Sequence, residues 1–541
     1  MSDTQQLLQL QNFETKTRFE WMNMPVTYAS LVNGTATYAS ELEKGIAQAR
    51  AGLGKDHPVR IGTEICAEVD QWHEEWSPID NTLLIGRFGW ATAEQTQRAL
   101  TAASAAFTLW SKVDVAERID ILRRTADRLE RDRFVLAGQI VLEAGKTPAE
   151  ALAEADEAPV FLRLYCDEFE RTNGFRTEMP ADADNESNVS VMRPYGVWAV
   201  ISPLNFPLAL ATGPSAAALV TGNTVVVKPS PAGQLAATVL RDALIAEGLP
   251  PNALTVLTGG AEVGAAITSS PLLGGVTFTG SYAVGSAIAT ALAPHSKPVV
   301  AEMGGKNPTI VGASADLDAA AEGIARSAFG YSGQKCSACS RVFVHESVYD
   351  ELKKKLVERT EAMTVGDPST EAVSVGPVIN AAAGERFTAA VDEIVGAGGV
   401  VLAGGTVISE APYDRGTYVR PTVVEAPSDA RAWRDELFLP IVAIKSVSTL
   451  EDAIRQANDS DYGLTAGIFT KDEAEIAEFL DAIESSVVYV NRRSGSTTGA
   501  WPGRQPISGW KHSGNTGRGT AGPHYLQQYL REQSRTVISE D

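Results

Sequence analysis

The sequence predicts an α/β fold built from two doubly wound parallel sheets. Two observations indicate this fold. Short apolar runs alternate with helical segments between residues 197 and 301, and the same alternation begins again after Gly304 and continues to residue 491. Strands joined by crossover helices form parallel sheets that are covered on both faces. Ligands of such sheets bind at the carboxyl ends of the strands, so we expect the functional residues there.

The chain before the first unit is predicted to be an extension followed by helices. Residues 1–80 show little periodicity, and we expect them to pack on the body of the protein. From Thr92 onward apolar residues recur at helical spacing. A second helix is expected to begin at Asp114 and to end at Gly145. The string Thr147-Pro148-Ala149-Glu150 then predicts the start of a third helix, because it combines an N-cap, a proline and a capping glutamate.

The first alternating unit contains five predicted strands and four predicted helices. The strands are expected at Val197–Ile201, Thr224–Val227, Leu254–Leu257, Gly275–Phe278 and Pro298–Ala301. The helices are expected at Pro214–Leu219, Leu235–Glu247, Val263–Ser269 and Val284–Leu292. Residues 194–227 carry no charge and are numerous enough to span a bilayer. Four prolines and a division into strand, loop, helix and strand favour a buried sheet instead.

The second unit shows the same alternation. Its strands are expected at Thr309–Val311, Arg341–His345, Val400–Ala403 and Val487–Asn491. Its helices are expected at Asp316–Phe329, Tyr349–Met363, Ala382–Ala397, Glu451–Asn458 and Glu473–Ile483. The two units are therefore interpreted as a cofactor domain and a catalytic domain.

The composition is typical of a soluble globular protein. The 541 residues carry a net charge of −21, and 44% of them are hydrophobic and 21% charged. A negatively charged protein repels a phosphate polymer, so we expect no nucleic-acid partner. Basic residues gather between 492 and 531, and we interpret them as a subunit interface or a solvated face.

The cysteine content predicts a reducing, cytoplasmic compartment. The chain has four cysteines, too few for a disulfide framework. Its start contains Asp3 and no early apolar core, so we expect no signal peptide. Cys336 and Cys339 form a C-x-x-C pair that is open to two other interpretations, half a zinc site or a redox pair. A structural zinc ion needs four ligands and the chain has no second pair of this kind, so we expect no metal.

Cys336 is the candidate nucleophile. It follows a predicted helix in the loop-like string Ser332-Gly333-Gln334-Lys335-Cys336. A thiolate attacks carbonyl carbons and is a workable leaving group, so a cysteine can form and release an acyl intermediate. Gly333 would let the backbone approach a substrate. The alternative is that Cys336 is a small buried hydrophobe, as most free cysteines are.

Glu302 and Asn205 supply the other two groups that oxidation of an aldehyde through a thioester requires. Glu302 ends an apolar run and precedes two glycines, a setting that would raise its pKa toward that of a general base. Its alternative role is a structural ion pair, with Lys306 as a partner. Asn205 lies in a loop after the first strand of the first unit.

Two strand-to-helix turns of the first unit are candidates for binding a dinucleotide. Lys228 and Ser230 follow the second strand, where a lysine can donate to ribose hydroxyls. Gly280 and Ser281 open a helix, where small residues let backbone amides approach a pyrophosphate. The strict G-x-G-x-x-G motif is absent, so a plain strand-to-helix turn remains the alternative.

Three strings together resemble the aldehyde dehydrogenase family: Ile201–Pro207, Val299–Asn307 and Gly333–Arg341. The last is similar to the branch that acts on glutamate γ-semialdehyde, the 1-pyrroline-5-carboxylate dehydrogenases. The likeness runs from about Asn81 to about Arg535. It implies an aldehyde-dehydrogenase-like fold of two Rossmann-like domains with a small oligomerisation segment.

The resemblance also implies a domain division and an assembly. Residues 1–300 are expected to form an NAD(P)-binding domain, with an inserted oligomerisation hairpin near 175–196. Residues 301–484 are expected to form the catalytic domain, and 485–541 an anchor loop and a C-terminal oligomerisation tail. A homodimer or a dimer-based homo-oligomer is expected, with a small aldehyde as substrate and no membrane partner.

The resemblance assigns roles to the candidate residues. Cys336 is expected to attack the aldehyde, Asn205 to hold the oxyanion with the Cys336 backbone N–H, and Glu302 to activate water. The expected cofactor is NAD. Its expected contacts are Ile201, Ser202, Lys228, Ser230, Gly280, Ser281, Glu436 and Phe438. Many NAD-preferring relatives carry a carboxylate where this chain has Pro231, so NADP stays open.

The implied activity is oxidation of L-glutamate γ-semialdehyde to L-glutamate in proline catabolism. Its substrate contacts are expected to be Phe206, Ser337, Gly499, Ala500 and Ile507. The family usually has an aromatic residue at the last position, so another carboxylated aldehyde such as succinate semialdehyde is the alternative substrate. Outside the enzyme class, the alternatives are a redox or zinc-binding protein and a non-catalytic cofactor-binding or structural protein.

Overall fold

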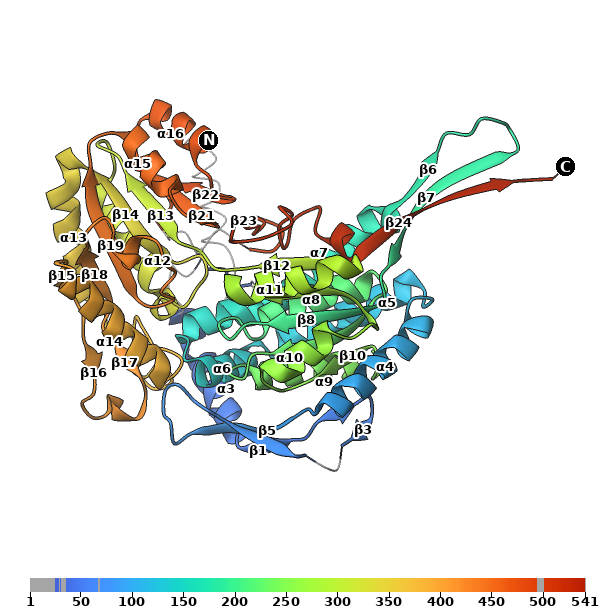
Figure 1. The fold of residues 1–541 in the computed structure, drawn as a ribbon. Helices are drawn as coiled ribbons and strands as arrows, with labels where there is room; N and C mark the ends of the chain where they lie inside the picture. The colour runs from blue at the N-terminus through green and yellow to red at the C-terminus, as the bar shows by residue number, and fades with distance from the viewer. Residues whose placement is uncertain (1–24, 29, 31–35, 67–68, 494–500, 541) are drawn as a thin grey trace.

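The computed structural model describes residues 25–28, 30, 36–66, 69–493 and 501–540. Two parallel sheets lie in two bodies, and a three-stranded arm projects from one of them (Figure 1). The expected α/β class with two doubly wound sheets is confirmed.

The N-terminal part packs on the first body, as the sequence predicts for the residues of it that are described. It contains the 3₁₀ turn η2 (Ala36–Tyr38), helix α3 (Ala39–Ala51) and short strands. Strands β1 (Lys55–His57), β5 (Leu84–Trp90) and β4 (Gln71–Trp76) form a sheet in that order, and β2 (Arg60–Ile61) pairs with β3 (Glu64–Ile65). This sheet lies below the first body in Figure 1.

Four helices follow: α4 (Ala93–Trp110), α5 (Val115–Arg131), α6 (Arg133–Ala144) and α7 (Pro148–Arg171). The sequence predicted one helix from Asp114 to Gly145, and the structure divides it at Asp132, whose backbone leaves the helical region. The predicted signals are present at both ends. The Asp114 side chain accepts a hydrogen bond from the first turn, and Gly145 ends α6 with a φ of 73°. Thr147 caps α7 through the Glu150 N–H.

The first sheet has five parallel strands in the order β10-β9-β8-β11-β12. Its strands are β8 (Val197–Ser202), β9 (Thr224–Pro229), β10 (Leu254–Val256), β11 (Leu273–Thr279) and β12 (Val299–Glu302). Its helices are α8 (Ala209–Val220), α9 (Gln234–Ala246), α10 (Ala261–Thr268) and α11 (Tyr282–Leu292), followed by η4 (Ala293–His295). The strand order reverses between β8 and β11, and this reversal is where open α/β sheets bind ligands.

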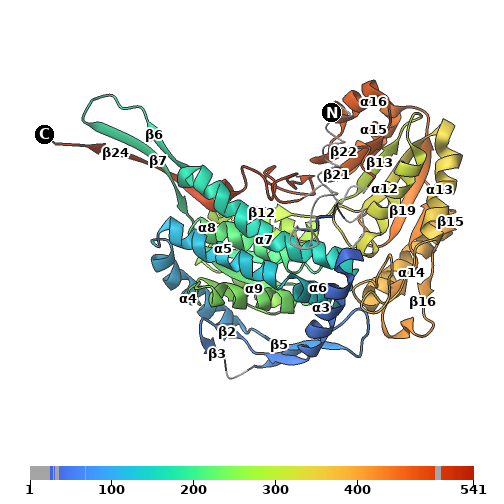
Figure 2. The same cartoon turned by 180° about the vertical axis from the view of Figure 1, so that it is seen from behind.

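Helices cover both faces of this sheet because its strands are apolar on both sides. Val225 and Val227 of β9 belong to a buried cluster with residues of α5, α7, α8 and α9. Val226 faces the opposite way and packs with residues of α4, α10 and α11. Seen from behind, α5, α7 and α8 lie in front of the sheet (Figure 2).

The second sheet has seven strands in the order β15-β18-β19-β14-β13-β21-β22. All neighbours are parallel except β15 and β18. The strands are β13 (Asn307–Val311), β14 (Cys339–His345), β15 (Val400–Ala403), β18 (Thr422–Glu425), β19 (Ile441–Val447), β21 (Thr465–Phe469) and β22 (Val487–Val490). The predicted list lacked β18, β19 and β21.

The helices of the second body are α12 (Leu317–Phe329), α13 (Tyr349–Glu361), α14 (Ala381–Gly396), α15 (Leu450–Asn458) and α16 (Glu473–Ala482). Short turns and strands connect them: η5 (Gly330–Gly333), η6 (Glu346–Val348), β16 (Val407–Ile408), η7 (Tyr413–Arg415), β17 (Tyr418–Val419), η8 (Arg431–Trp433) and β20 (Tyr462–Gly463). Two buried clusters sandwich the sheet, one with α14, α15 and α16 and one with α12 and α13.

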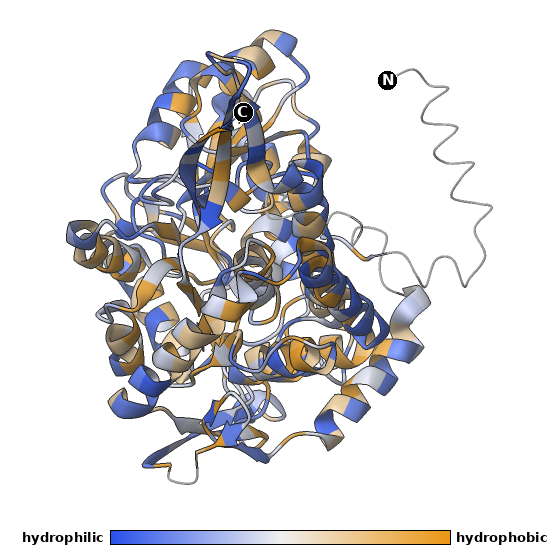
Figure 3. Ribbon diagram, turned by 90° about the vertical axis from the view of Figure 1, so that its right-hand side faces the viewer, coloured by the Kyte–Doolittle hydropathy of each residue, from blue (hydrophilic) through white to orange (hydrophobic). Residues whose placement is uncertain are grey.

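The arm joins two distant parts of the chain. After η3 (Asn173–Phe175), β6 (Arg176–Met179) and β7 (Glu186–Pro194) form a hairpin, and β24 (Leu530–Ile538) pairs antiparallel with β7. Its strands carry both hydrophilic and hydrophobic residues (Figure 3). Between the bodies and the arm run β23 (Trp510–Lys511) and η10 (Leu526–Tyr529). The proposed domain limits stay a prediction, and β22 pairs within the second sheet although it falls in the segment 485–541.

Candidate active site

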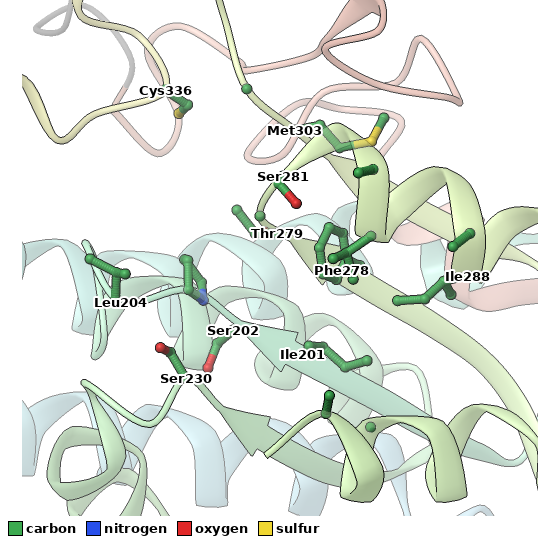
Figure 4. Close-up of a pocket in the computed structure, with 18 of the residues that line it drawn as sticks. Ile201, Ser202, Leu204, Ser230, Phe278, Thr279, Ser281, Ile288, Met303 and Cys336 are labelled. Atoms are coloured by element: carbon green, nitrogen blue, oxygen red, sulfur yellow. The ribbon is translucent and has the colours of Figure 1, made fainter. Parts of the chain in front are cut away.

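A cavity of about 920 Å³ lies at the carboxyl ends of the strands of the first sheet. Asn205 and Cys336 both line it, and Figure 4 shows Cys336 on a loop facing Ser202, Ser230 and Ser281. The cavity is also lined by every residue predicted to contact a cofactor: Ile201, Ser202, Lys228, Ser230, Gly280, Ser281, Glu436 and Phe438. The structure thus brings these residues together with the candidate nucleophile.

The loop that carries Cys336 has an unusual backbone. Tyr331, Ser332 and Gly333 have φ values of 48°, 53° and 68° in succession. The Ser332 hydroxyl donates to the carbonyl of Gly376 at 2.7 Å, which helps to hold this turn. A Cβ atom at Gly333 would lie 2.4 Å from the carbonyl oxygen of Leu439. Gly333 is therefore needed for close contact with a neighbouring chain segment, and its expected role in the approach of a substrate stays a prediction.

The second sheet holds Cys336 through Asn307. The side-chain amide of Asn307, at the start of β13, donates to the carbonyls of Cys336 at 2.7 Å and Ala338 at 2.9 Å. Its oxygen accepts from the Thr465 backbone N–H at 2.9 Å, which fixes the amide orientation. A Cβ atom at Gly305 would lie 2.4 Å from the Cys336 carbonyl oxygen, so only glycine allows this approach.

Burial sets the ionisation of Cys336. Burial, together with the nearby carboxylates of Glu436 and Glu302, raises the pKa of the thiol to about 12. Backbone N–H groups of Ser337 and of Cys336 itself act in the opposite direction. The thiol is therefore protonated at neutral pH, and a group that removes its proton must act before or during attack.

Glu302 ends β12 beside this loop. The Thr520 hydroxyl donates to Glu302 Oε1 at 2.8 Å, and burial raises the pKa of the carboxyl to about 7. Within the described part of the chain, no lysine or arginine forms an ion pair with Glu302. The alternative of a structural ion pair with Lys306 therefore has no support. A carboxyl with this pKa can accept a proton near neutral pH.

Asn205 lies in the loop after β8 and is buried. Its side-chain amide donates to the Gln334 carbonyl at 3.0 Å. An amide carries two N–H donors, and this contact uses one of them. The Gln334 side chain accepts from the Ile379 backbone N–H at 2.8 Å, so the segment just before Cys336 is tied down on both sides.

The cofactor part of the cavity suits a dinucleotide. Ser281 is the N-cap residue of α11 and its side chain forms no cap, so the first amides of this helix are left for an anion such as a pyrophosphate. Burial lowers the pKa of Lys228 to about 8, and its ammonium donates to the Pro229 carbonyl at 3.0 Å. Glu436 accepts from the Gly305 N–H at 3.0 Å, is half-buried and lines the same cavity. Cavity size, helix terminus and polar ends fit a nicotinamide dinucleotide.

The predicted substrate residues are only partly described. Gly499 and Ala500 lie outside the described residues. The Phe206 ring lies 6.0 Å from that of Tyr28, and Lys146 Nζ lies 3.6 Å from its centre. Ser337 and Ile507 are half-buried.

Of the three described candidates, Ser337 directly follows Cys336, and Ile507 contacts Thr520, the partner of Glu302. The Ser337 carbonyl accepts from the Thr465 hydroxyl at 3.3 Å. The Ile507 N–H donates to the Thr520 carbonyl at 3.0 Å, which links this residue to the partner of Glu302.

Sequence reasoning missed three residues of the site. Tyr28 comes from the weakly periodic extension, where no local pattern marked it. Thr520 reaches Glu302 across 218 positions of the chain, and no motif announced this contact. Arg386 of α14 lines the cavity from the second body. The sequence placed Arg386 on an exposed part of a predicted helix, and this exposed charge was the signal that could have identified it.

The C-x-x-C pair does not resemble a metal or redox centre. Cys339 is buried, its Sγ lies 3.2 Å from the Thr309 hydroxyl, and burial raises its pKa to about 11. Among the described residues, no group of three or more His, Cys, Asp or Glu side chains could hold a metal ion. None of the helices in the same part of the chain is long and apolar enough to cross a membrane.

Comparison with known proteins shows which family the chain belongs to. Residues 67–535 match the aldehyde dehydrogenase family. The chain is 36% identical over 504 residues to a 1-pyrroline-5-carboxylate dehydrogenase of Geobacillus sp. strain WCH70, covering 92% of this chain and 95% of that protein. The predicted resemblance to these dehydrogenases is confirmed.

Two solved structures share the fold. 1-Pyrroline-5-carboxylate dehydrogenase from Thermus with bound NAD superimposes with a TM-score of 0.88 at 29% identity, covering 94% of this chain and 97% of that one. Proline utilization A from Bdellovibrio bacteriovorus gives 0.86 at 34% identity, covering 92% of this chain but 52% of that longer one. The chain therefore belongs to the aldehyde dehydrogenase family and is an oxidoreductase that acts on aldehydes with a nicotinamide cofactor.

Proposed function

We propose that the protein oxidises L-glutamate γ-semialdehyde, the ring-opened form of 1-pyrroline-5-carboxylate, to L-glutamate in proline catabolism. The observation that carries this proposal is 36% identity to a 1-pyrroline-5-carboxylate dehydrogenase over nearly the whole length of both chains. Cys336 and Asn205 line the cofactor cavity, and Glu302 lies close enough to Cys336 to raise its pKa, which supports the proposal.

The first half of the reaction forms an acyl-enzyme. Cys336 Sγ bonds to the aldehyde carbon, and its proton passes to a water molecule of the cavity. The oxyanion accepts from the second amide N–H of Asn205 and from the Cys336 backbone N–H, and each such donor contributes about 3 kcal/mol. When bound, the nicotinamide cofactor supplies the hydride acceptor that the oxidation requires. The acyl group then remains on Cys336 as a thioester.

The second half releases the product. Glu302 takes a proton from water as the water oxygen bonds to the thioester carbon. The C–S bond breaks, the carboxylic acid leaves, and the thiolate of Cys336 is regenerated. Because burial brings the pKa of Glu302 to about 7, its carboxylate is both available and basic near neutral pH.

We propose NAD as the preferred cofactor, with NADP as an accepted second one. Ile201, Ser202, Lys228 and Ser230 would hold the adenosine half, and Gly280 and Ser281 the pyrophosphate. Glu436 and Phe438 would hold the nicotinamide ribose. Pro231 lines the cavity beside Lys228, where a carboxylate would repel a 2′-phosphate.

Substrate choice is proposed to depend on an anion site at the far end of the pocket. Gly499, Ala500 and Ser337 would bind the α-carboxylate, and Phe206 and Ile507 would contact the aliphatic part of the substrate. Isoleucine lacks a ring face, so succinate semialdehyde is the second candidate substrate.

We also propose a cytoplasmic homo-oligomer. All four cysteines are free, which suits a reducing compartment. The arm exposes Met179, Val537 and Ile538 to 49%, 61% and 65%. Apolar side chains on a projecting sheet indicate a surface that a second copy of the chain covers.

A substrate panel tests the proposed function. The purified enzyme is assayed with 1-pyrroline-5-carboxylate, succinate semialdehyde and propanal, each with NAD and with NADP. We expect the highest kcat/KM for 1-pyrroline-5-carboxylate with NAD. Ser337→Ala should raise KM for the carboxylated substrates and hardly change that for propanal, because an unpaired anion contact costs about 1–3 kcal/mol. Equal kcat/KM for propanal and 1-pyrroline-5-carboxylate would refute the substrate assignment.

A further inference from the structure

A chain of buried hydroxyl groups begins at Glu302. The Thr520 hydroxyl donates to Glu302 Oε1 at 2.8 Å. The Tyr525 hydroxyl interacts with the side chains of Thr520 and of Thr277. The Tyr529 hydroxyl in turn donates to that of Tyr525 at 2.8 Å. Three side chains of the C-terminal segment thus continue from the carboxylate away from the cavity.

The far end of the chain lies inside the first sheet. The Thr277 hydroxyl of β11 lies 2.9 Å from the Tyr529 hydroxyl. The indole N–H of Trp198, on β8, donates to the Thr277 hydroxyl at 3.0 Å. All these side chains are buried, and the Asn223 amide fixes the Tyr529 carbonyl at 3.0 Å.

The groups at the two ends of this series of hydrogen bonds determine the direction in which its hydroxyl groups donate. An indole nitrogen only donates, and an ionised carboxylate only accepts. Each hydroxyl has a single proton to donate. Because Trp198 donates to Thr277, and Tyr529 to Tyr525, the Thr277 proton must point to Tyr529. Because Thr520 gives its proton to Glu302, its hydroxyl oxygen is left to accept, and the Tyr525 proton can point to it. In this arrangement every donation runs toward the carboxylate.

Three titratable groups act on or near Glu302: the thiol of Cys336 and the phenols of Tyr165 and Tyr525. Burial raises the pKa of both tyrosines above their ordinary value, so both hydroxyls stay protonated over the neutral range. The Tyr165 hydroxyl accepts from the Ala521 N–H at 3.1 Å, and its ring stacks on Tyr525 at 5.4 Å. The groups on this side of Glu302 therefore remain neutral while Glu302 titrates.

We propose that Thr520, Tyr525, Tyr529 and Thr277 form a positioning relay that holds Glu302 as an ionised acceptor and is closed to protons at Trp198. The relay rests on the proposed role of Glu302 as the base of deacylation. In that step Glu302 gains one proton from water, and it must lose that proton before the next turnover. Passage through the relay would require the Trp198 nitrogen to accept a proton, and its lone pair belongs to the aromatic ring. The proton therefore leaves toward the cavity and solvent.

Hydroxyl deletions along the relay test this proposal. The variants are Thr520→Val, Tyr525→Phe and Tyr529→Phe in the full-length enzyme, with Thr520→Ser as the conservative variant. Tyr418→Phe is the matched control, because the buried Tyr418 hydroxyl makes one hydrogen bond, to the Ile79 carbonyl at 3.0 Å, away from this relay. The NADH burst and the steady-state rate are measured with 1-pyrroline-5-carboxylate and NAD as functions of pH.

We expect a graded loss of deacylation. Thr520→Val should keep the burst but lower the steady-state rate about tenfold to a hundredfold, the range for a lost hydrogen bond to a charged group. Its rate should also rise with pH at a higher pH than in the wild type, because the lost donor stabilised the carboxylate. Tyr525→Phe should have a smaller effect, Tyr529→Phe a smaller one still, and Thr520→Ser and Tyr418→Phe almost none.

Each of the other possible outcomes would contradict a particular part of the proposal. An unchanged pH profile and rate in both Thr520→Val and Tyr525→Phe would overturn the positioning role. A proton wire fails equally wherever one of its links is broken. If Tyr529→Phe slowed turnover as much as Tyr525→Phe, the relay would therefore conduct protons, and the proposal that it is closed at Trp198 would be wrong. Glu302→Gln is measured in parallel. Normal turnover in that variant would refute the proposed function itself, independently of the relay.

Discussion

Glu302 and Cys336 come from different sheets, yet the carboxylate lies close enough to the thiol to raise the pKa of Cys336. Glu302 ends β12 in the first sheet, and Cys336 precedes β14 in the second. The contact between the two bodies therefore assembles the pair. This arrangement places the proposed base of deacylation near the residue proposed to carry the thioester.

Replacement of Cys336 separates chemistry from cofactor binding. Cys336→Ala should abolish aldehyde oxidation and leave NAD binding, measured by calorimetry, nearly unchanged, because other side chains hold the cofactor. Cys339→Ala is the matched control. That thiol is buried beside Thr309 and should be dispensable for activity. An inactive Cys339→Ala together with an active Cys336→Ala would reverse the assignment.

The pKa of Glu302 predicts different pH dependences for the two half-reactions. Deacylation needs the ionised carboxylate, so the steady-state rate should rise with pH through about 7 and then level off. Below pH 7 the acyl-enzyme should accumulate, and the NADH burst should persist while steady turnover falls. Stopped-flow measurements of the burst and of steady turnover check this prediction. They should run from about pH 5.5 to about pH 9, so that the range brackets the pKa of Glu302. A burst that vanishes together with steady turnover would contradict it.

The raised pKa of Glu302 also makes the stability of the folded protein depend on pH. The pKa of Glu302 in the folded state lies above its unfolded value of about 4.3, so the folded protein binds more protons between these two values. Stability contributed by this group is therefore lost as pH rises from about 4.3 to about 7. Glu302→Gln should unfold at the same or a higher temperature than the wild type at pH 8. A lower unfolding temperature there would show that the charge is compensated.

A buried ion pair next to the pocket predicts a large stability effect. Lys146 and Glu154 are fully buried, with Nζ and Oε2 2.6 Å apart. Glu154 Oε1 also accepts from the Leu208 N–H at 2.9 Å, at the start of α8. Lys146→Met should destabilise the protein by about 3–5 kcal/mol, because it leaves a buried carboxylate without its cation.

The control for this prediction is an exposed pair. Lys44 and Glu41 lie 2.8 Å apart, with 69% of the Lys44 side chain exposed. Lys44→Met should change stability by less than about 1 kcal/mol. Thermal unfolding of both variants at one pH gives the comparison. Equal unfolding temperatures for the two variants would mean that burial of the Lys146 pair has no energetic consequence.

The sequence predicted the five strands of the first sheet and four of the seven strands of the second, but missed β18, β19 and β21. β18, β19 and β21 are buried on both faces, so their side chains do not alternate between apolar and polar. Period-two patterns identify half-buried strands and say little about such central ones. The caps at Asp114 and Thr147 were visible because they depend on neighbours within one helical turn.

The candidate site was predictable where a residue follows a strand or lies in a family motif. Lys228, Gly280 and Cys336 are of this kind. Thr520 was not, because its relation to Glu302 arises when a distant loop folds back on β12. Tyr28 was missed for the same reason, since its hydroxyl reaches Glu157 at 2.8 Å, 129 positions away.

Pro231 predicts the balance between the two cofactors. Pro231→Glu should place a carboxylate beside Lys228 and lower kcat/KM for NADP by tenfold or more, because like charges repel at the 2′-phosphate. The value for NAD should change far less, and Pro231→Gln serves as the uncharged control of the same size. Steady-state kinetics with both cofactors decide the matter. An equal loss for NAD and NADP in Pro231→Glu would mean that this position does not face the adenosine ribose.

Acid quenching of Glu302→Gln during turnover tests the central claim most directly. This variant should transfer one hydride per active site and then stall, because the acyl group on Cys336 has no activated water. Mass spectrometry of the digested protein should then find one glutamyl group on the peptide that contains Cys336, and none after the same treatment of Cys336→Ala. A glutamyl group on another residue, or release of NADH without any covalent adduct, would contradict the account.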